Sequence, residues 1–170
     1  MSQAEFNQSS AHKHFAVAFN QLTWELLGQA KRSQVDEDRL RYAAYASAMH
    51  WSVVGTQVEI SRAEWLISRM HCVLGDPVGA LRHAQRCMQI MEGSLEGEGF
   101  KAGSGFKDFD LAYGVEAMAR AHALAGQSDQ SAQFQKLARA LGDAIEAPED
   151  KKIFMGDLDA GPWNPNGERF

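Results

Sequence analysis

The chain has 170 residues, of which 45% are hydrophobic and 23% are charged, and this composition is typical of a single globular domain. Its formal charge of −5 argues against a nucleic-acid-binding protein, because such proteins usually carry a basic stripe or patch. No stretch approaches 18 apolar residues, no signal peptide is visible, and two cysteines cannot form a disulfide framework, so we expect a cytoplasmic protein without a membrane partner.

Helices are expected over most of the chain, because apolar and small residues recur at three- and four-residue spacing in six segments and in a short seventh. The first helix is predicted to run through Phe15 and Leu26. The second follows Ser33-Gln-Val-Asp36, and the third follows Thr56-Gln-Val-Glu59. In each tetrapeptide a hydroxyl and a carboxylate have the spacing of a capping box, which marks the N-terminus of a helix.

The remaining predicted helices are separated by turn-forming residues. Gly75-Asp76-Pro77 combines a helix-ending glycine, an N-cap and a first-turn proline, so a fourth helix is expected to begin there. A fifth is expected from about Asp108 to Gly126. Ser128 is predicted to cap the sixth helix, and Pro148 to begin the seventh. Because no segment alternates apolar and polar residues, the predicted fold class is all-α.

A single domain, residues 10–158, accounts for these helices. Within it, five glycines fall among the 13 residues of 93–105, so the connection at 93–107 is predicted to be a mobile loop. The loop lacks the Lys-Ser/Thr of a Walker motif and the strand that precedes a dinucleotide-binding fingerprint, so no phosphate site is expected there. Residues 1–9 are expected to form a flexible lead, and residues 159–170 an irregular tail.

The chain contains an internal repeat. Arg69-Met-His-Cys-Val-Leu-Gly75 aligns with Arg120-Ala-His-Ala-Leu-Ala-Gly126, and an apolar–small pair precedes each copy. The same kind of pair occurs in Trp24-Glu-Leu-Leu27-Gly28, with Lys31 where the pattern has an aromatic residue. These residues resemble the tetratricopeptide repeat, a helical hairpin of about 34 residues whose first helix carries Trp-x₂-Leu-Gly-x₂-Tyr. The copies are degenerate and stand further apart than that period.

The resemblance implies a right-handed α–α superhelix of about three degenerate hairpins plus a short C-terminal capping helix. In such a stack the first helix of each hairpin lines a concave groove. Arg69 and Arg120 occupy equivalent places, so we expect both guanidinium groups in one hollow, where they suit an acidic or carboxylate-bearing peptide. Alternatively, Arg120 pairs with Glu116, and Arg69 lies over Trp65, purely on the surface. The predicted partner-binding groove consists of Arg62, Trp65, Arg69, Tyr113, Glu116 and Arg120.

No sequence motif indicates catalysis or a bound metal. The six histidines form no HExxH pair, and no Gly-x-Ser-x-Gly elbow is present. His71 and His122 stand where the repeat usually has a tyrosine, so we expect them to be half-buried between helices. Cys72 and Cys87 are interpreted as small core residues. We therefore expect no catalytic residue, no metal ligand and no cofactor.

The leading functional hypothesis is a non-enzymatic module that binds a protein or peptide in the groove. A second hypothesis places a small-molecule or metal site, with or without enzymatic turnover, under the glycine-rich loop, formed by Glu116, Arg120 and His50. A third is a homodimer that covers the apolar ends of the stack. Residues 50–56 and 109–120 also resemble a family of uncharacterised bacterial proteins, a resemblance that carries no function.

Overall fold

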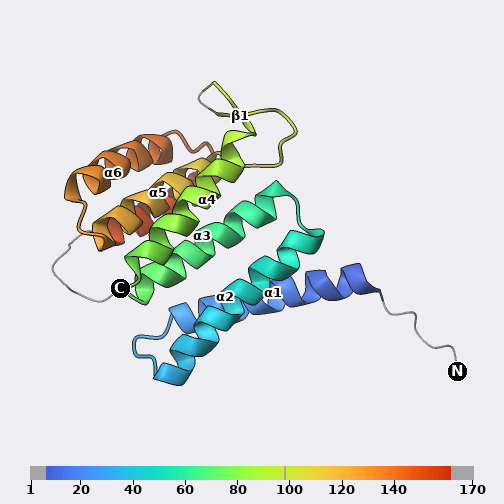
Figure 1. Cartoon of the computed structure of the whole chain (residues 1–170). Helices are drawn as coiled ribbons and strands as arrows, with labels where there is room; N and C mark the ends of the chain where they lie inside the picture. Colours follow the sequence, from blue (N-terminus) through green and yellow to red (C-terminus); the bar gives the residue numbers. More distant parts are fainter. Residues whose placement is uncertain (1–6, 98, 162–170) are drawn as a thin grey trace, which may run out of the picture.

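The computed structural model describes residues 7–97 and 99–161, and within them the predicted all-α class is confirmed (Figure 1). Within these ranges, no helix is long and apolar enough to cross a membrane. Besides its helices, the described part of the chain contains one short antiparallel hairpin. The elements are α1 (Gln8–Leu27), α2 (Gln34–Val54), α3 (Gln57–Val73), α4 (Pro77–Glu92), β1 (Leu95–Glu96), β2 (Gly99–Phe100), α5 (Asp108–Leu124), α6 (Ser128–Asp143) and α7 (Pro148–Ala160).

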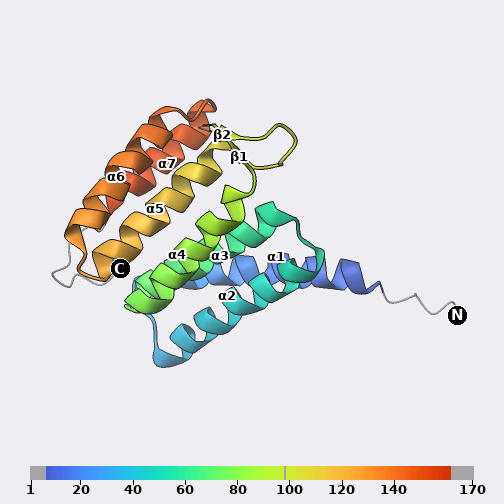
Figure 2. The ribbon, with the colours of Figure 1, turned by 45° about the horizontal axis from the view of Figure 1, so that its top comes forward.

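Consecutive helices pack as hairpins. The most extensive contacts join α1 with α2, α3 with α4, and α5 with α6. Neighbouring hairpins meet where α2 packs on α3 and where α4 and α3 pack on α5, and α7 packs on α5 and α6. Figure 2 shows the result: α5, α6 and α7 lie together at one end of the molecule, and α1 and α2 lie at the other.

Most predicted helix starts are confirmed. Ser33 and Thr56 each form a capping box with the carboxylate three residues later, and Asp76 accepts hydrogen bonds from the first amides of α4. The prediction for α6 is wrong by one residue, because Ser128 is already helical and Gln127 is the N-cap, without a side-chain hydrogen bond.

The helices α3 and α5 end in the same way, 51 residues apart. Gly75 and Gly126 follow these helices with φ angles of 73° and 72°, a left-handed conformation that glycine adopts without strain. In both turns the amide after the glycine donates to a histidine carbonyl at 2.9 Å, that of His71 in one and of His122 in the other. The aligned segments of the sequence repeat thus form identical helix ends.

The first copy of the repeat is not equivalent to the other two. Helix α1 ends at Leu27, and Gly28 is its C-cap with an ordinary φ of −72°. Gly28 and Lys31 therefore lie in the connection to α2, not inside a first helix as the tetratricopeptide pattern requires. The segment Trp24-Glu-Leu-Leu27-Gly28 therefore does not occupy the position in a first helix that the resemblance implied. An apolar–small pair is such a short pattern that it also occurs at helix ends.

The glycine-rich connection has secondary structure that the sequence did not suggest. β1 pairs with β2 in a short antiparallel hairpin. The Phe100 ring stacks on Phe106 with centroids 4.7 Å apart, and Phe106 is buried against Val58 of α3 and the end of α4. The two phenylalanines thus anchor this connection to the helices.

The boundaries of the predicted domain also shift slightly. Helix α1 already includes residues 8 and 9, which we predicted to belong to a flexible lead, and α7 continues to Ala160 within the predicted irregular tail. Asn7 and Gly161 are the N-cap of α1 and the C-cap of α7. The rest of those two predictions falls on residues 1–6 and 162–170, which lie outside the described residues.

Candidate functional site

A groove of about 400 Å³ runs between the first helices of the hairpins and α7. Its walls come from α1, α3, α5 and α7, with one contribution from α4. The lining residues that matter for its chemistry are Asn20, Trp24, Arg62, Trp65, Phe109, Asp110, Tyr113, Ile153 and Asp157. Three of the six predicted residues, Arg62, Trp65 and Tyr113, are among them.

Aromatic rings from three successive first helices form one wall of the groove. Trp24 of α1 lies 5.7 Å from Trp65 of α3, and Trp65 meets Tyr113 of α5 edge-to-face at 5.3 Å, measured between ring centroids. Tyr113 in turn packs on the buried Phe154 of α7 at 4.9 Å. The Trp24 residue is 46% exposed, so this row offers accessible aromatic surface on a rigid backing.

The polar side of the groove is an ion pair. Arg62 donates from Nε and Nη2 to the two carboxylate oxygens of Asp110, at 2.7 and 2.9 Å, and its guanidinium lies over the Phe109 ring. Asp110 also accepts from the Lys107 amide at 2.8 Å. The hydrogen bond with Asp110 raises the pKa of Arg62. The pair is therefore fixed in orientation, and Nη1 of Arg62 is not used by it.

A second polar contact ties α5 to α7. The Tyr113 hydroxyl donates to Asp157 Oδ2 at 2.7 Å, and burial followed by this hydrogen bond raises the pKa of Tyr113. The tyrosine thus stays neutral at ordinary pH. Its ring faces the groove while its hydroxyl holds the capping helix.

Arg120 and Glu116 do not lie open in the groove, which corrects the prediction for both residues. Arg120 is 1% exposed and Glu116 is fully buried. The guanidinium donates from Nε to Glu116, from Nη1 to the Gly161 carbonyl, and from Nη2 to the Asp157 carbonyl at 2.8 Å. The physical reason is α7, whose C-terminal carbonyls cover the arginine and take up its hydrogen bonds.

The expected hollow between two arginines is closed. Arg69 donates to Glu116 at 3.4 Å, and burial together with the nearby Arg120 lowers the pKa of Arg69. The space among Trp65, Arg69, Glu116 and Arg120 is too narrow for a water molecule. Trp65 Nε1 and Glu116 Oε2 are buried there without a hydrogen-bond partner. This cluster holds α3, α5 and α7 together. The guanidinium of Arg120 is buried, and that of Arg69, whose side chain is 26% exposed, is already paired with Glu116.

A hydrogen-bonded chain of five side chains links α2, α3 and α4. The Tyr45 hydroxyl lies 2.9 Å from Nε2 of His71 and 3.0 Å from Nε2 of His83, whose rings are stacked. On the other ring nitrogens, His71 contacts Asp76 at 2.9 Å and His83 contacts Glu64 at 2.6 Å. One hydroxyl donates only one hydrogen, so Tyr45 can donate to only one of the two Nε2 atoms. The chain stabilises the seam between the first two hairpins.

The second predicted site is not assembled. Glu116 and Arg120 lie under α7, whereas His50 lies on α2, with its Nδ1 2.9 Å from that of His12 on α1. Within residues 7–97 and 99–161, no group of three or more His, Cys, Asp or Glu side chains has the arrangement of a metal site. His122, half-buried as expected, stacks on Phe134 of α6.

Both cysteines are buried thiols, as the sequence interpretation proposed. Burial raises the pKa of Cys72 and of Cys87 to about 12. Cys87 lies at the floor of the groove, 3.3 Å from the Ser61 hydroxyl, and Cys72 lines the closed space beside Arg69. Neither thiol has the exposure and the low pKa that a nucleophile requires.

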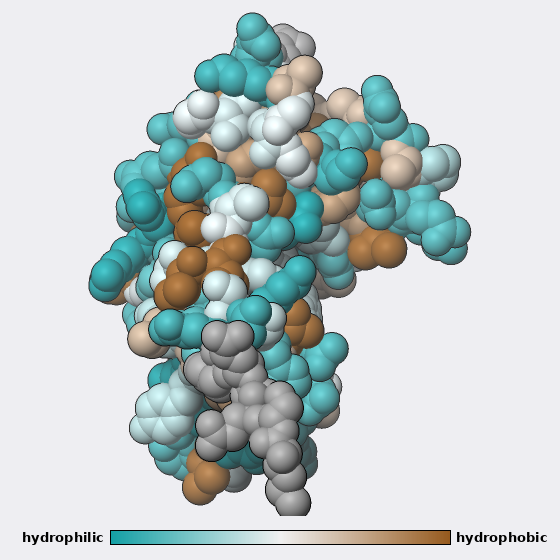
Figure 3. All heavy atoms as spheres, turned by 90° about the vertical axis from the view of Figure 1, so that its right-hand side faces the viewer, coloured by the Kyte–Doolittle hydropathy of each residue, from teal (hydrophilic) through white to brown (hydrophobic). Residues whose placement is uncertain are grey.

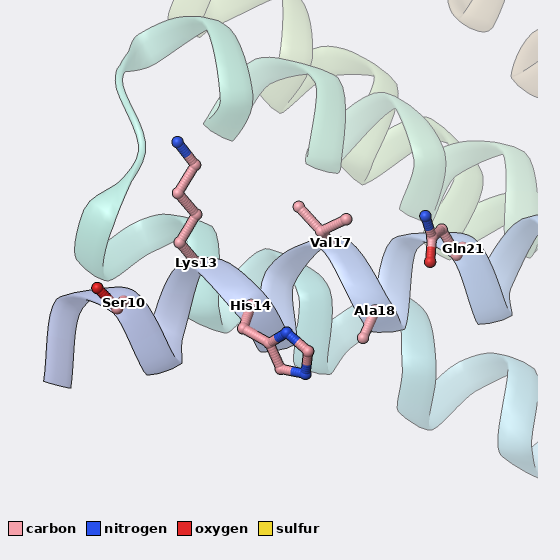
Figure 4. A pocket seen from close by; sticks show the side chains of 6 residues that line it. All are labelled: Ser10, Lys13, His14, Val17, Ala18 and Gln21. Carbon is pink, nitrogen blue, oxygen red and sulfur yellow. The ribbon is translucent and has the colours of Figure 1, made fainter. Parts of the chain in front are cut away.

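A shallow hollow of about 450 Å³ lies along α1, and Figure 4 shows its side chains. Lys13, Val17 and Gln21 project to one side of the helix there, and His14 and Ala18 to the other. A single helix supplies every lining residue. The hollow therefore cannot enclose a ligand as the groove can.

Sequence reasoning missed the part of the groove that comes from outside the repeat pattern. Trp24 was assigned to a repeat signature, and Asp110 was not predicted as a site residue, although it accepts hydrogen bonds from Arg62 and from the Lys107 amide. Asp157 and Ile153 gave no signal, since only the packing of α7 brings them to the groove. No family model matches the chain, and the curated proteins and the solved structures likewise gave no match.

Proposed function

We propose that this chain is a non-enzymatic peptide-binding module, built as a right-handed superhelix of three hairpins that resemble tetratricopeptide repeats, with α7 as the cap. The pairwise packing of consecutive helices supports this architecture. The identical helix ends at Gly75 and Gly126 support it further, since they mark two copies of one structural unit. Arrays of this kind bind partners along an extended concave surface.

The observation that carries the proposal is the row of aromatic rings in the groove. Trp24, Trp65 and Tyr113 come from three successive first helices, and all three line a space of about 400 Å³. That volume lies within the range of small-ligand sites and accommodates one or two large side chains of a peptide. Aromatic residues are also the side chains most enriched where binding energy is concentrated.

The chemistry of the groove indicates an apolar or aromatic peptide segment in place of the acidic one that the sequence suggested. Arg62 and Arg69 already have carboxylate partners in Asp110 and Glu116. Bringing a further carboxylate would require one of these pairs to break. The guanidinium of Arg62 still has Nη1 free of its ion pair, and this group suits a backbone carbonyl of a bound peptide.

The proposal is tested by selecting peptides from a random display library against the immobilised protein and titrating the winners by tryptophan fluorescence. We expect selected sequences to share an aromatic or large aliphatic residue. Trp24→Ala should weaken their binding at least tenfold, because truncating an exposed aromatic anchor removes about 1.4 kcal/mol or more. Arg62→Gln should weaken it by a smaller factor.

Leu137→Ala serves as the control, because Leu137 is also an exposed large apolar residue but lies on α6 outside the groove. It should leave peptide affinity unchanged. Failure to select any peptide, or equal affinity for the wild-type and Trp24→Ala proteins, would refute the groove as the binding site.

A further inference from the structure

Helix α2 has two apolar faces, and only one of them is packed. Its buried side consists of small and aliphatic residues that face α1 and α3. Almost opposite, residues at spacings of seven, four, three and four form a second apolar stripe. We call this the outward stripe; it consists of Val35, Tyr42, Ala46, Met49 and Val53. A helix that is apolar on both sides is normally covered on both sides.

The outward stripe is strongly exposed. Tyr42 is 73% exposed, Val35 and Met49 are each 66% exposed, and Val53 is 56% exposed. With Phe15 and Tyr45 at its edges, the stripe presents on the order of 600 Å² of apolar and aromatic surface, approaching the roughly 800 Å² that each partner of a stable interface covers. Figure 3 views the molecule from the side toward which the N-terminus points in Figure 1, and groups of hydrophobic residues interrupt the hydrophilic surface there.

Exposed apolar residues concentrate at this end of the molecule. Of the eleven large hydrophobic side chains that are exposed among the described residues, eight belong to α1 and α2. The opposite end is closed by α7, which buries Phe154 and Leu158. A helical array requires a polar or covered outer face on its terminal units. The N-terminal hairpin has neither within the described part of the chain.

The order of residues in the stripe suits a second copy of this chain. Read in either direction, it has a valine at each end, a large flexible or aromatic residue next to it, and the small Ala46 near the centre. An antiparallel contact between two copies of α2 with its two-fold axis between positions 45 and 46 places Tyr42 against Met49, twice over, and the two Ala46 side chains beside the axis. Val35 and Val53 lie further out, three residues from direct opposition. Self-complementarity of this kind is what an isologous interface requires.

The charges beside the stripe are compatible with that contact. Asp38 and Arg39, which flank it, carry opposite charges, and the antiparallel arrangement sets them against the uncharged residues 52–53 of the other copy. No like charges meet. A small residue at the crossing point also allows two helices to approach closely, as Ala46 does here.

We propose that the chain forms a two-fold symmetric dimer through antiparallel packing of the outward stripe of α2. The groove contains no residue of α2, so each copy keeps its groove open in the dimer. The inference is independent of the proposed peptide binding.

The test is the mass of the full chain in solution, measured by sedimentation across a concentration series. We expect wild-type protein to be dimeric and Met49→Glu to be monomeric with an unchanged helical circular dichroism spectrum, because one carboxylate would be buried in each half of the contact. Val78→Glu is the matched control: Val78 is 76% exposed, but it lies at the start of α4 and not on α2. This variant should remain dimeric.

A second variant locates the two-fold axis. Ala46→Cys should cross-link two chains efficiently with a short bismaleimide, whereas Val78→Cys should not, and the native cysteines are buried. A monomeric wild-type chain at all concentrations would overturn the proposal. So would a dimer that Met49→Glu leaves intact, a loss of dimer that Val78→Glu shares, or equal cross-linking at positions 46 and 78.

Discussion

The two ends of the helical array are built with different chemistry. At the C-terminal end, α7 covers α5 with the buried side chains of Phe154 and Leu158, and its last turn takes up the hydrogen bonds of Arg120. At the N-terminal end, no described segment covers the outward stripe of α2, and Tyr42 and Met49 are mostly exposed. One end is closed within the chain by a helix and a buried ion pair. The other presents an apolar stripe.

The short capping helix α7 is held in place by two kinds of contact. Helix α7 has only two fully buried apolar side chains, which alone give a modest anchor. The guanidinium of Arg120 adds directional contacts, because it reaches the carbonyls of Asp157 and Gly161 while its charge is balanced by Glu116. The buried pair therefore specifies where α7 docks, and the apolar contacts supply most of the burial.

Removing Arg120 should break the closed end and has the largest expected effect. Arg120→Met leaves Glu116 buried without its main counter-charge and removes the hydrogen bonds to α7. We expect the free energy of unfolding to fall by about 3–5 kcal/mol, measured by urea denaturation. Hydrogen exchange should show the amides of α7 losing protection before those of α3.

Two controls separate a buried pair from an ordinary arginine. Arg120→Met combined with Glu116→Met should recover a large part of the loss, because replacing a whole buried pair by apolar residues is often neutral. Arg139→Met removes an exposed pair with Asp159 and should leave the free energy of unfolding nearly unchanged. Equal losses for Arg120→Met and Arg139→Met would contradict the role assigned to the buried pair.

Substitutions at two glycines test how closely α7 packs on α6, and their expected effects on stability are of intermediate size. A Cβ at Gly142 of α6 would lie 2.6 Å from Cδ1 of Phe154 and 2.8 Å from Sδ of Met155, so Gly142→Ala should push α7 outward. We expect a loss of about 1–3 kcal/mol in the free energy of unfolding. At Gly156, on α7 itself, a Cβ meets nothing within 4 Å. Gly156→Ala should therefore stabilise the protein by about 0.5–1 kcal/mol.

Thermal denaturation followed by circular dichroism measures both glycine variants. The opposite signs are the informative result, since both substitutions add one methyl group and differ only in what it meets. If Gly142→Ala were as stable as Gly156→Ala, the close packing of α6 on α7 would be contradicted.

The smallest expected effect is a pH dependence of stability from His71, which contacts Tyr45 where α3 packs on α2. Burial lowers the pKa of His71 below its ordinary value of 6.5; Asp76 opposes this shift, while His83 and Arg41 reinforce it. Below pH 6.5 the unfolded chain therefore binds more protons at His71 than the folded chain does. The free energy of unfolding should fall as the pH drops from about 6.5 toward the lower folded pKa.

Urea denaturation at several pH values between about 5.5 and 7.5 measures this dependence. His71→Gln should make the slope shallower, whereas His14→Gln, which alters an exposed histidine of α1, should leave it unchanged. A slope in His71→Gln equal to that of the wild type would show that His71 does not couple folding to pH.

The helices were predictable from the sequence wherever a short-range interaction defines them. The hydroxyl–carboxylate pairs at Ser33 and Thr56 act within one turn, and so does the Asp76–Pro77 start of α4, so local spacing is sufficient. Ser128 was predicted to be the N-cap of α6 but is its first helical residue. The local sequence does not separate these two adjacent positions. The hairpin of β1 and β2 was missed because two-residue strands are too short to show alternation.

The candidate site was predictable only in part, because its arrangement depends on contacts between distant segments. Trp65 and Tyr113 were found through the repeat, which places them on first helices. The fate of Arg120 was not, since its partners at Asp157 and Gly161 are 37 and 41 residues away along the chain. Asp110 was not among the predicted site residues, because its bond to Arg62 spans 48 residues.

The reactivity of the two buried cysteines can report how often the protein opens locally. A thiol with a pKa of about 12 reacts with alkylating reagents only while its surroundings are open, so the reaction rate measures how often that happens. The alkylation rate of Cys87 measures how often the groove floor becomes exposed, and that of Cys72 measures how often α3 separates from α5. If the molecule opens as one unit, both thiols should be alkylated at the same rate. If the hairpins move separately, the two rates should differ.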